Sequence, residues 1–210
     1  NISFTVKKGE TLGIIGRTGS GKSTIISLLL NQYETPSGSI MIDGKSITQC
    51  NLVEFYDNCG VVPQDVFLFS DTIKNNIEFG STNHENIADI IEVCKDACVL
   101  DNINNFPDKF NTLLGERGVN LSGGQKQRIS IARALIRNPS LLVLDDCLSA
   151  VDTETEDEIL NNLNRDAEKR TSIIVSHRIS TIRHATNIIV LDNGEIIEKG
   201  THQSLLKSEG

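Results

Sequence analysis

The first third of the chain alternates short apolar runs with turn residues, which is typical of strands joined to helices. Ile2–Val6 alternates apolar and polar residues like a half-buried strand, and Thr11–Ile15 is a short apolar run. An apolar helix is predicted from about Lys22 to Asn31. Two more strands are predicted at Ser39–Ile42 and Cys59–Pro63.

The pattern changes from about Val66 to Asn138, where helical periodicity dominates and no segment is a convincing strand. Helices are predicted at Ile73–Phe79, Asn86–Cys98 and Gln125–Arg137.

Strands and helices alternate again after Pro139. The predicted strands are Leu141–Leu144, Ser172–Ser176, Asn187–Leu191 and Glu195–Lys199, the last two joined by a hairpin turn at Asp192-Asn193-Gly194. Thr153–Glu168 is predicted to be an acidic amphipathic helix that turns Ile159, Leu160 and Leu163 inward. We therefore expect an α/β core of residues 1–65 and 139–210, interrupted by a helical subdomain at 66–138.

Composition narrows the class of protein. The 210 residues are 38% hydrophobic and carry a net charge of -8, which disfavours nucleic acid and anionic lipid as partners. No apolar run approaches the roughly 20 residues of a membrane span. The chain begins without Met or a signal peptide, so we expect a fragment of a longer polypeptide. The five cysteines lack zinc-site spacing, so packed thiols are favoured over metal ligands.

A phosphate-binding loop lies between a predicted strand and a predicted helix. It comprises Gly16, Arg17, Thr18, Gly19, Ser20, Gly21, Lys22, Ser23 and Thr24. Its glycines allow backbone N–H groups to turn toward phosphate oxygens, and the helix N-terminus adds partial positive charge. Lys22 is expected to reach the outer phosphates of a nucleoside triphosphate, and Ser23 to bind Mg²⁺. Asp145, which follows the apolar run Leu141–Leu144, is a second candidate ligand for Mg²⁺.

Leu121-Ser122-Gly123-Gly124-Gln125 opens a predicted helix and resembles the signature motif of ABC-transporter nucleotide-binding domains. The resemblance covers essentially the whole chain. It implies a P-loop NTPase (RecA-like) core of the ABC ATPase type, with a small β subdomain and a helical insertion. In that family the signature binds the γ-phosphate of ATP held by a second nucleotide-binding domain. Ser122, Gly123, Gly124 and Gln125 are thus expected to bind ATP across a head-to-tail dimer, either homodimeric or heterodimeric.

Three more segments match the family pattern. Gln64 resembles the glutamine that contacts Mg²⁺ and the attacking water, and His177 resembles the switch histidine that contacts the γ-phosphate. Ser149–Asp152 resembles the loop that crosses to the other subunit.

Two segments resemble exporters in particular. Val62–Ser70, followed by Thr72-Ile73, resembles the exporter coupling region, and Gly115–Gly118 resembles the loop that senses the transmembrane helices. The resemblance implies a transmembrane domain in the same polypeptide, a place on the cytoplasmic face of the cell membrane, and ATP-driven export.

The chain departs from the family pattern at two points. The aromatic residue that stacks on adenine would lie upstream of Asn1. Asp146 occupies the position of the usual glutamate general base, and its side chain is one methylene shorter, which favours a weakened hydrolytic site over harmless variation. Two alternatives stay open: a largely non-hydrolytic regulatory half, and an ABC ATPase with no role in transport.

Overall fold

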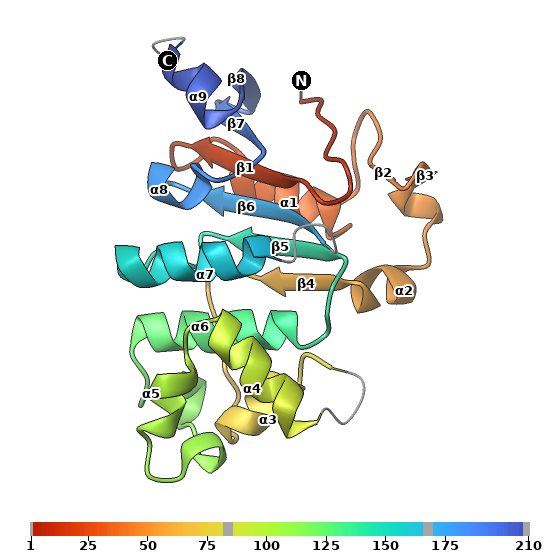
Figure 1. The fold of residues 1–210 in the computed structure, drawn as a ribbon. Coiled ribbons are helices and arrows are strands. Elements are labelled where there is room, and N and C mark those ends of the chain that lie inside the picture. Colours follow the sequence, from red (N-terminus) through yellow and green to blue (C-terminus); the bar gives the residue numbers. More distant parts are fainter. Residues whose placement is uncertain (1, 82–85, 166–169, 208–210) are drawn as a thin grey trace.

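A six-stranded sheet forms the centre of the computed structural model, which describes residues 2–81, 86–165 and 170–207 (Figure 1). The strand order is β4-β5-β6-β1-β7-β8, and every neighbouring pair is parallel except β7 and β8. The strands are β1 (Thr11–Gly16), β4 (Cys59–Val62), β5 (Leu141–Asp145), β6 (Thr171–Ser176), β7 (Asn187–Asp192) and β8 (Glu195–Gly200). The predicted hairpin joins β7 to β8, with Asn193 and Gly194 both at positive φ.

Successive residues of the central strands face different helices, because side chains alternate along a strand. Leu142 and Leu144 of β5 belong to a buried cluster with side chains of α6 (Gly123–Leu135), α7 (Thr153–Arg165) and α8 (Ile179–Ile182). Val143 belongs to a second cluster with side chains of α1 (Lys22–Leu29) and α2 (Leu52–Asp57). Helices α1 and α6 therefore cover opposite faces of the sheet.

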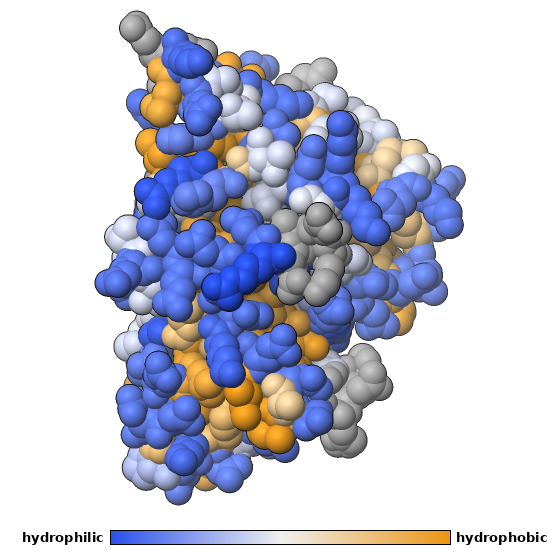
Figure 2. All heavy atoms as spheres, viewed as in Figure 1, coloured by the Kyte–Doolittle hydropathy of each residue, from blue (hydrophilic) through white to orange (hydrophobic). Residues whose placement is uncertain are grey.

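The predicted change to helices in the middle of the chain is confirmed. Helices α3 (Ile73–Glu78), α4 (Ile87–Asp96) and α5 (Leu100–Asn104) gather with α6 at one end of the molecule (Figure 1). Figure 2 shows a largely hydrophilic face on which hydrophobic side chains collect over this helical end. The described residues also form 3-10 turns at Ile47–Gln49, Lys109–Asn111 and Glu116–Gly118, and a last helix, α9 (His202–Lys207).

Two predicted strands differ from the structure. Ile2–Val6 forms no strand, although Ile2, Phe4 and Val6 still pack half-buried against the cluster on the α1 face. The alternating pattern therefore reports burial here and not pairing in the sheet. Ser39–Ile42 shortens to β2 (Met41–Ile42), which pairs only with β3 (Lys45–Ser46) in a separate small hairpin.

Helix ends differ from prediction by a few residues. α6 begins at Gly123, two residues early, because Ser122 caps it. α1 and α3 end at Leu29 and Glu78, before the predicted Asn31 and Phe79. α7 is described as far as Arg165; its predicted end at Glu168 lies outside the described residues.

The cysteines are free thiols, as the packed-thiol interpretation requires. Cys94 of α4 is fully buried, and burial raises its pKa to about 12. Within the described ranges, no three His, Cys, Asp or Glu side chains cluster so that they could hold a metal ion. None of the helices described there is long and apolar enough to cross a bilayer.

Candidate functional site

The phosphate-binding loop and the predicted residues Gln64, Asp145, Asp146 and His177 lie at one edge of the sheet. Parallel strands place their carboxyl ends together, and β4, β5, β6 and β1 are consecutive neighbours. Gln64 lies just after β4, and His177 follows β6. Asp145 is the last residue of β5, and Asp146 follows it. β1 ends at Gly16, where the phosphate-binding loop begins. Four segments far apart in the sequence thus form one row (Figure 1).

The loop 16–24 requires its glycines. Gly19 and Gly21 have φ of 84° and 100°, a region that side chains other than glycine rarely occupy. A Cβ atom on Gly16 would lie 2.3 Å from the carbonyl oxygen of Leu191. The loop is thus a tight turn that opens helix α1.

Lys22 and Ser20 show how this turn is arranged internally. The Nζ atom of Lys22 donates to the carbonyl oxygens of Gly16, at 2.7 Å, and Arg17, at 3.0 Å. The buried Oγ of Ser20 has no hydrogen-bond partner among the described residues. Arg17, Thr18 and Gly19, which precede Ser20 in the loop, are exposed. An ammonium group, an open loop and an unused hydroxyl fit a phosphate chain.

Ser23 and Asp145 bring two oxygen ligands together. The start of α1, which carries Ser23, packs against β5, which ends at Asp145. Burial raises the pKa of Asp145; the nearby Ser23 hydroxyl and the charge of Lys22 oppose this, whereas neighbouring Asp146 adds to it. A hydroxyl and a carboxylate are suitable ligands for Mg²⁺. Gln64 is exposed at the same edge.

Asp146 contacts His177 directly. Oδ1 of Asp146 lies 2.8 Å from Nδ1 of His177, and the N–H of Asp146 donates to the carbonyl of Val175 on β6 at 2.8 Å. Asp146 has a φ of 48°, so the chain turns sharply as it leaves β5. The Asp146 side chain is mostly buried, whereas that of His177 is 55% exposed. A carboxylate and an imidazole are thus held side by side, and of the two the imidazole is the more exposed to solvent.

The signature motif forms a compact helix start. Ser122 accepts from the N–H of Gln125, and Gln125 accepts through Oε1 from the N–H of Ser122, a capping box. Gly124 is packed so closely that an added Cβ would lie 2.8 Å from the carbonyl oxygen of Ala150. The structure seats this helix on the face opposite α1, and so does not bring the signature together with the phosphate-binding loop of the same chain.

Three polar residues around the loop 149–152 were missed from the sequence. Gln127 of α6 donates to Ser149 Oγ at 3.2 Å and accepts from the N–H of Ala150 at 3.0 Å. Arg178 donates to the carbonyl of Ser149 at 2.5 Å and pairs with the fully buried Glu156. Glu156 lies on the inward stripe of α7, and a charge on that stripe was the available signal.

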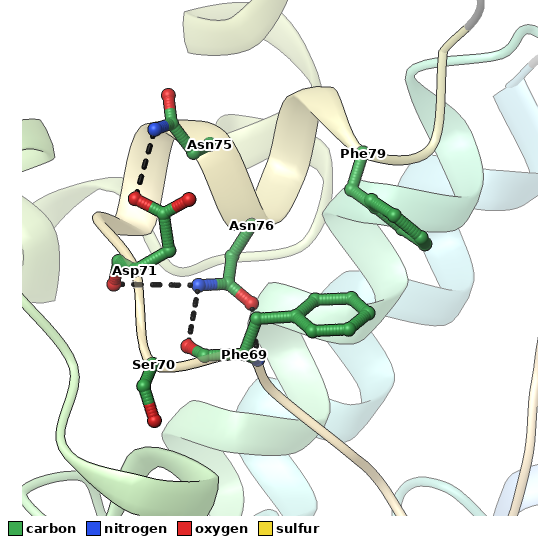
Figure 3. Close-up of a pocket in the computed structure, with 6 residues that line it drawn as sticks. All are labelled: Phe69, Ser70, Asp71, Asn75, Asn76 and Phe79. Atoms are coloured by element: carbon green, nitrogen blue, oxygen red, sulfur yellow. Dashed lines mark hydrogen bonds between the residues drawn. The ribbon is translucent and has the colours of Figure 1, made fainter.

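A patch of three exposed phenylalanines, Phe67, Phe69 and Phe79, lies beside α6. The rings of Phe69 and Phe79 lie 4.5 Å apart and line a pocket with Ser70, Asp71, Asn75 and Asn76 (Figure 3). Arg133 of α6 lies near both rings and donates to Asn76 and to the carbonyl of Phe67. Burial lowers its pKa to about 10. Arg133 therefore connects the signature helix α6 to the phenylalanine patch.

Known proteins resemble this chain along its whole length. The family model for ABC transporters matches residues 1–149. The chain is 46% identical over all 210 residues to an ATP-dependent lipid A-core flippase of Haemophilus influenzae, and 48% identical to a probable multidrug resistance ABC transporter ATP-binding/permease protein of Bacillus subtilis. A solved structure of a bacterial Atm1-family ABC exporter with ATP bound superposes with a TM-score of 0.96 at 42% identity.

These relatives are longer than the chain. It spans 36% of the flippase and of the multidrug protein, and 37% of the solved exporter chain, while each match covers 100% of the chain itself. The comparisons confirm the expected fold class and the exporter resemblance.

Proposed function

Because this chain belongs to the ABC transporter family, we propose that it is the ATP-hydrolysing unit of an exporter. The observation that carries the proposal is the row of Gln64, Asp145, Asp146 and His177 beside the loop 16–24, on consecutive parallel strands. This row groups phosphate-binding, metal-binding and proton-accepting side chains at a single edge.

ATP is held by the loop and by Lys22. The Lys22 ammonium now donates to two loop carbonyls, and phosphate oxygens would provide stronger, charge-assisted acceptors. The start of α1 adds the backbone N–H groups that attract an anion.

Ser23 and Asp145 would hold Mg²⁺, with Gln64 at the same edge. The bound ion would neutralise phosphate charge. It would also favour the ionised form of Asp145, which burial disfavours.

Asp146 accepts a proton from the attacking water, and His177 holds the Asp146 carboxylate through Nδ1. The short aspartate side chain sets this base back from the position that a glutamate would reach. We propose that the site binds ATP normally and hydrolyses it slowly.

Two chains act head to tail. Helices α1 and α6 cover opposite faces of one sheet, so the signature residues Ser122–Gln125 and the loop 16–24 cannot close on one nucleotide within one chain. A second domain of the same type, identical or not, supplies the missing signature. Residues 66–138 form the subdomain that carries it, and residues 1–65 and 139–210 form the ATP-binding core.

A transmembrane domain contacts the phenylalanine patch. Three exposed aromatic side chains on one surface suit an apolar partner better than water. Arg133 links this patch to the signature helix, so closure of the ATP-bound dimer moves it. With this contact, we propose that the chain lies on the cytoplasmic face of a membrane.

Titration of the chain with Mg-ATP, followed by steady-state ATPase measurement, tests the proposal. We expect binding that weakens when Mg²⁺ is chelated, together with slow turnover. Binding without turnover would instead support the non-hydrolytic regulatory half. Absence of binding would overturn the proposal.

A further inference from the structure

A closed ring of hydrogen bonds includes Ser176 and Arg178, the two residues on either side of His177. Ser176 Oγ accepts from the N–H of Arg178 at 3.0 Å and donates to Thr181 Oγ1 at 3.1 Å. Thr181 Oγ1 donates to Glu156 Oε1, and the Arg178 guanidinium donates to Glu156 Oε2 at 3.3 Å. The ring thus begins and ends on Arg178. His177 lies between two of its members, so its backbone is held on both sides.

Glu156 determines where the guanidinium of Arg178 lies. Its side chain is fully buried, and a buried carboxylate requires a charged partner and hydrogen bonds. Arg178, Thr181 and Ser180 supply them. The Arg178 side chain is 35% exposed and would otherwise be free to sample many rotamers.

The fixed guanidinium also hydrogen-bonds to the loop 149–152. It donates to the carbonyl of Ser149 at 2.5 Å and to that of Val151 at 3.4 Å. Gln127 of α6 also hydrogen-bonds to this loop, donating to Ser149 Oγ and accepting from the N–H of Ala150. Ala150 in turn packs against Gly123 and Gly124. Contacts therefore run without a break from His177 to the start of the signature helix.

We infer that Arg178 is a positioning residue that couples His177 to the loop 149–152 and to the signature helix, with Glu156 as its anchor. The inference rests on the proposed ATPase function. If His177 senses nucleotide in its own site, Arg178 transmits that displacement to the loop and the signature, which serve the partner's site. Because Arg178 acts through other residues, its loss should lower turnover and leave ATP binding in place.

Steady-state kinetics of the full chain test this inference. For Arg178→Ala we expect a fall in kcat of about tenfold or more, since small displacements of reacting groups are costly, with KM and the Kd for Mg-ATP within about twofold. Arg178→Lys, which keeps the charge but loses the forked donor set, should recover part of the rate. Glu156→Gln should lower kcat in the same direction.

Arg183 and Asp157 provide a matched control. They form an ion pair of 2.7 Å that, like the pair of Arg178 and Glu156, links α7 to a residue at an end of α8. Arg183→Ala should leave kcat unchanged. An Arg178→Ala value of kcat within twofold of wild type would overturn the inference, and so would equal losses in kcat and ATP affinity. If Arg178→Ala does not fold, Arg178→Lys and Glu156→Gln decide by the same criteria. Absence of ATP binding by the wild-type chain would instead overturn the proposed function.

Discussion

Asp146 and His177 are joined by a contact of 2.8 Å between a carboxylate oxygen and Nδ1 of the imidazole. The positive φ of Asp146 and its backbone bond to Val175 direct the short side chain along β6 toward His177. The carboxylate is therefore oriented toward His177, on a side chain one methylene shorter than the glutamate that the family resemblance leads us to expect at this position. Its position, and not its chemistry, is what we expect to limit turnover.

Asp146→Glu should raise kcat by about tenfold or more, since one added methylene restores the reach of a general base that contributes roughly 10²–10⁴-fold. Asp146→Asn should lower kcat below wild type because the amide accepts no proton. Both variants should bind Mg-ATP with unchanged affinity. Steady-state ATPase assays give the first quantity and calorimetric titration the second.

Asp157→Glu is the matched control, because the same methylene is added to a carboxylate whose ion-pair partner, Arg183, belongs neither to the row of site residues nor to the loop 16–24. It should leave kcat unchanged. Equal rates for wild type and Asp146→Glu would mean that Asp146 already works as an efficient base, and the weakened-site proposal would then be wrong.

Lys22→Ala should weaken Mg-ATP binding by about tenfold to a hundredfold, the value of one or two charged hydrogen bonds. Calorimetric titration measures the loss, and circular dichroism checks the fold, because Lys22 also donates to two loop carbonyls. Lys45→Ala, on the exposed strand β3, is the control. Undiminished affinity in a folded Lys22→Ala protein would contradict the assignment of the loop.

The core strands and long helices were predictable because burial is recorded in their apolar periods. β5 is a continuous apolar run and α7 repeats apolar residues at helical spacing, and both are confirmed. Ile2–Val6 alternates apolar and polar residues but forms no strand. Such a pattern predicts which side chains are buried, and does not show whether the backbone pairs with another strand. The capped start of α6 was also misjudged, since glycines look like loop until Ser122 is recognised as the cap.

The row of site residues could be anticipated one motif at a time, but their adjacency comes from the strand order, which the sequence does not state. Gln127 and Arg178 could not be predicted as site residues, because the role of a polar side chain depends on its contacts in the folded chain. Both bind the same loop from elements remote in the sequence.

Gly123→Asp should abolish ATP-dependent dimerisation, because it places an anion where the partner's γ-phosphate is proposed to bind. Sedimentation of the chain with Mg-ATP under non-hydrolysing conditions measures the loss. Gly123→Ala separates size from charge, since its Cβ would lie 3.2 Å from that of Ala150 and requires only a small shift. The proposed trans site fails if Gly123→Asp associates as wild type does.

Gly80→Ala should destabilise the fold by roughly 1–3 kcal/mol through overpacking. Its Cβ would lie 1.9 Å from the carbonyl oxygen of Arg133, and its own carbonyl accepts from Arg137. Urea denaturation measures the change. Gly38→Ala is the control for adding a methyl group, because nothing lies within 4 Å of its Cβ and only its φ of 84° opposes the change. A Gly80→Ala protein as stable as wild type would contradict this close contact.

Asp145→Asn should separate the burial of this carboxyl from its role with Mg²⁺. Burial raises the folded-state pKa of Asp145, so the folded protein binds the proton more tightly than the unfolded chain does. That contribution to stability is present below the ordinary carboxyl pKa of about 3.9 and is lost as the pH rises through the raised value. Without Mg²⁺, Asp145→Asn should therefore melt above wild type at pH 7, by a margin that shrinks as the pH falls toward 4.

Asp152→Asn is the control of opposite sign, because the N–H of Thr155 lowers the pKa of exposed Asp152. The stability that Asp152 contributes is present above its ordinary pKa, so this variant should melt below wild type across the same range. Mg-ATP at about 100 times its Kd should stabilise wild type by about 2.7 kcal/mol. Asp145→Asn should lose most of that increment, because the Mg²⁺ ligand is gone, whereas Asp152→Asn should keep it. Thermal melts with and without Mg-ATP measure both effects, and a full increment in Asp145→Asn would remove Asp145 from the metal site.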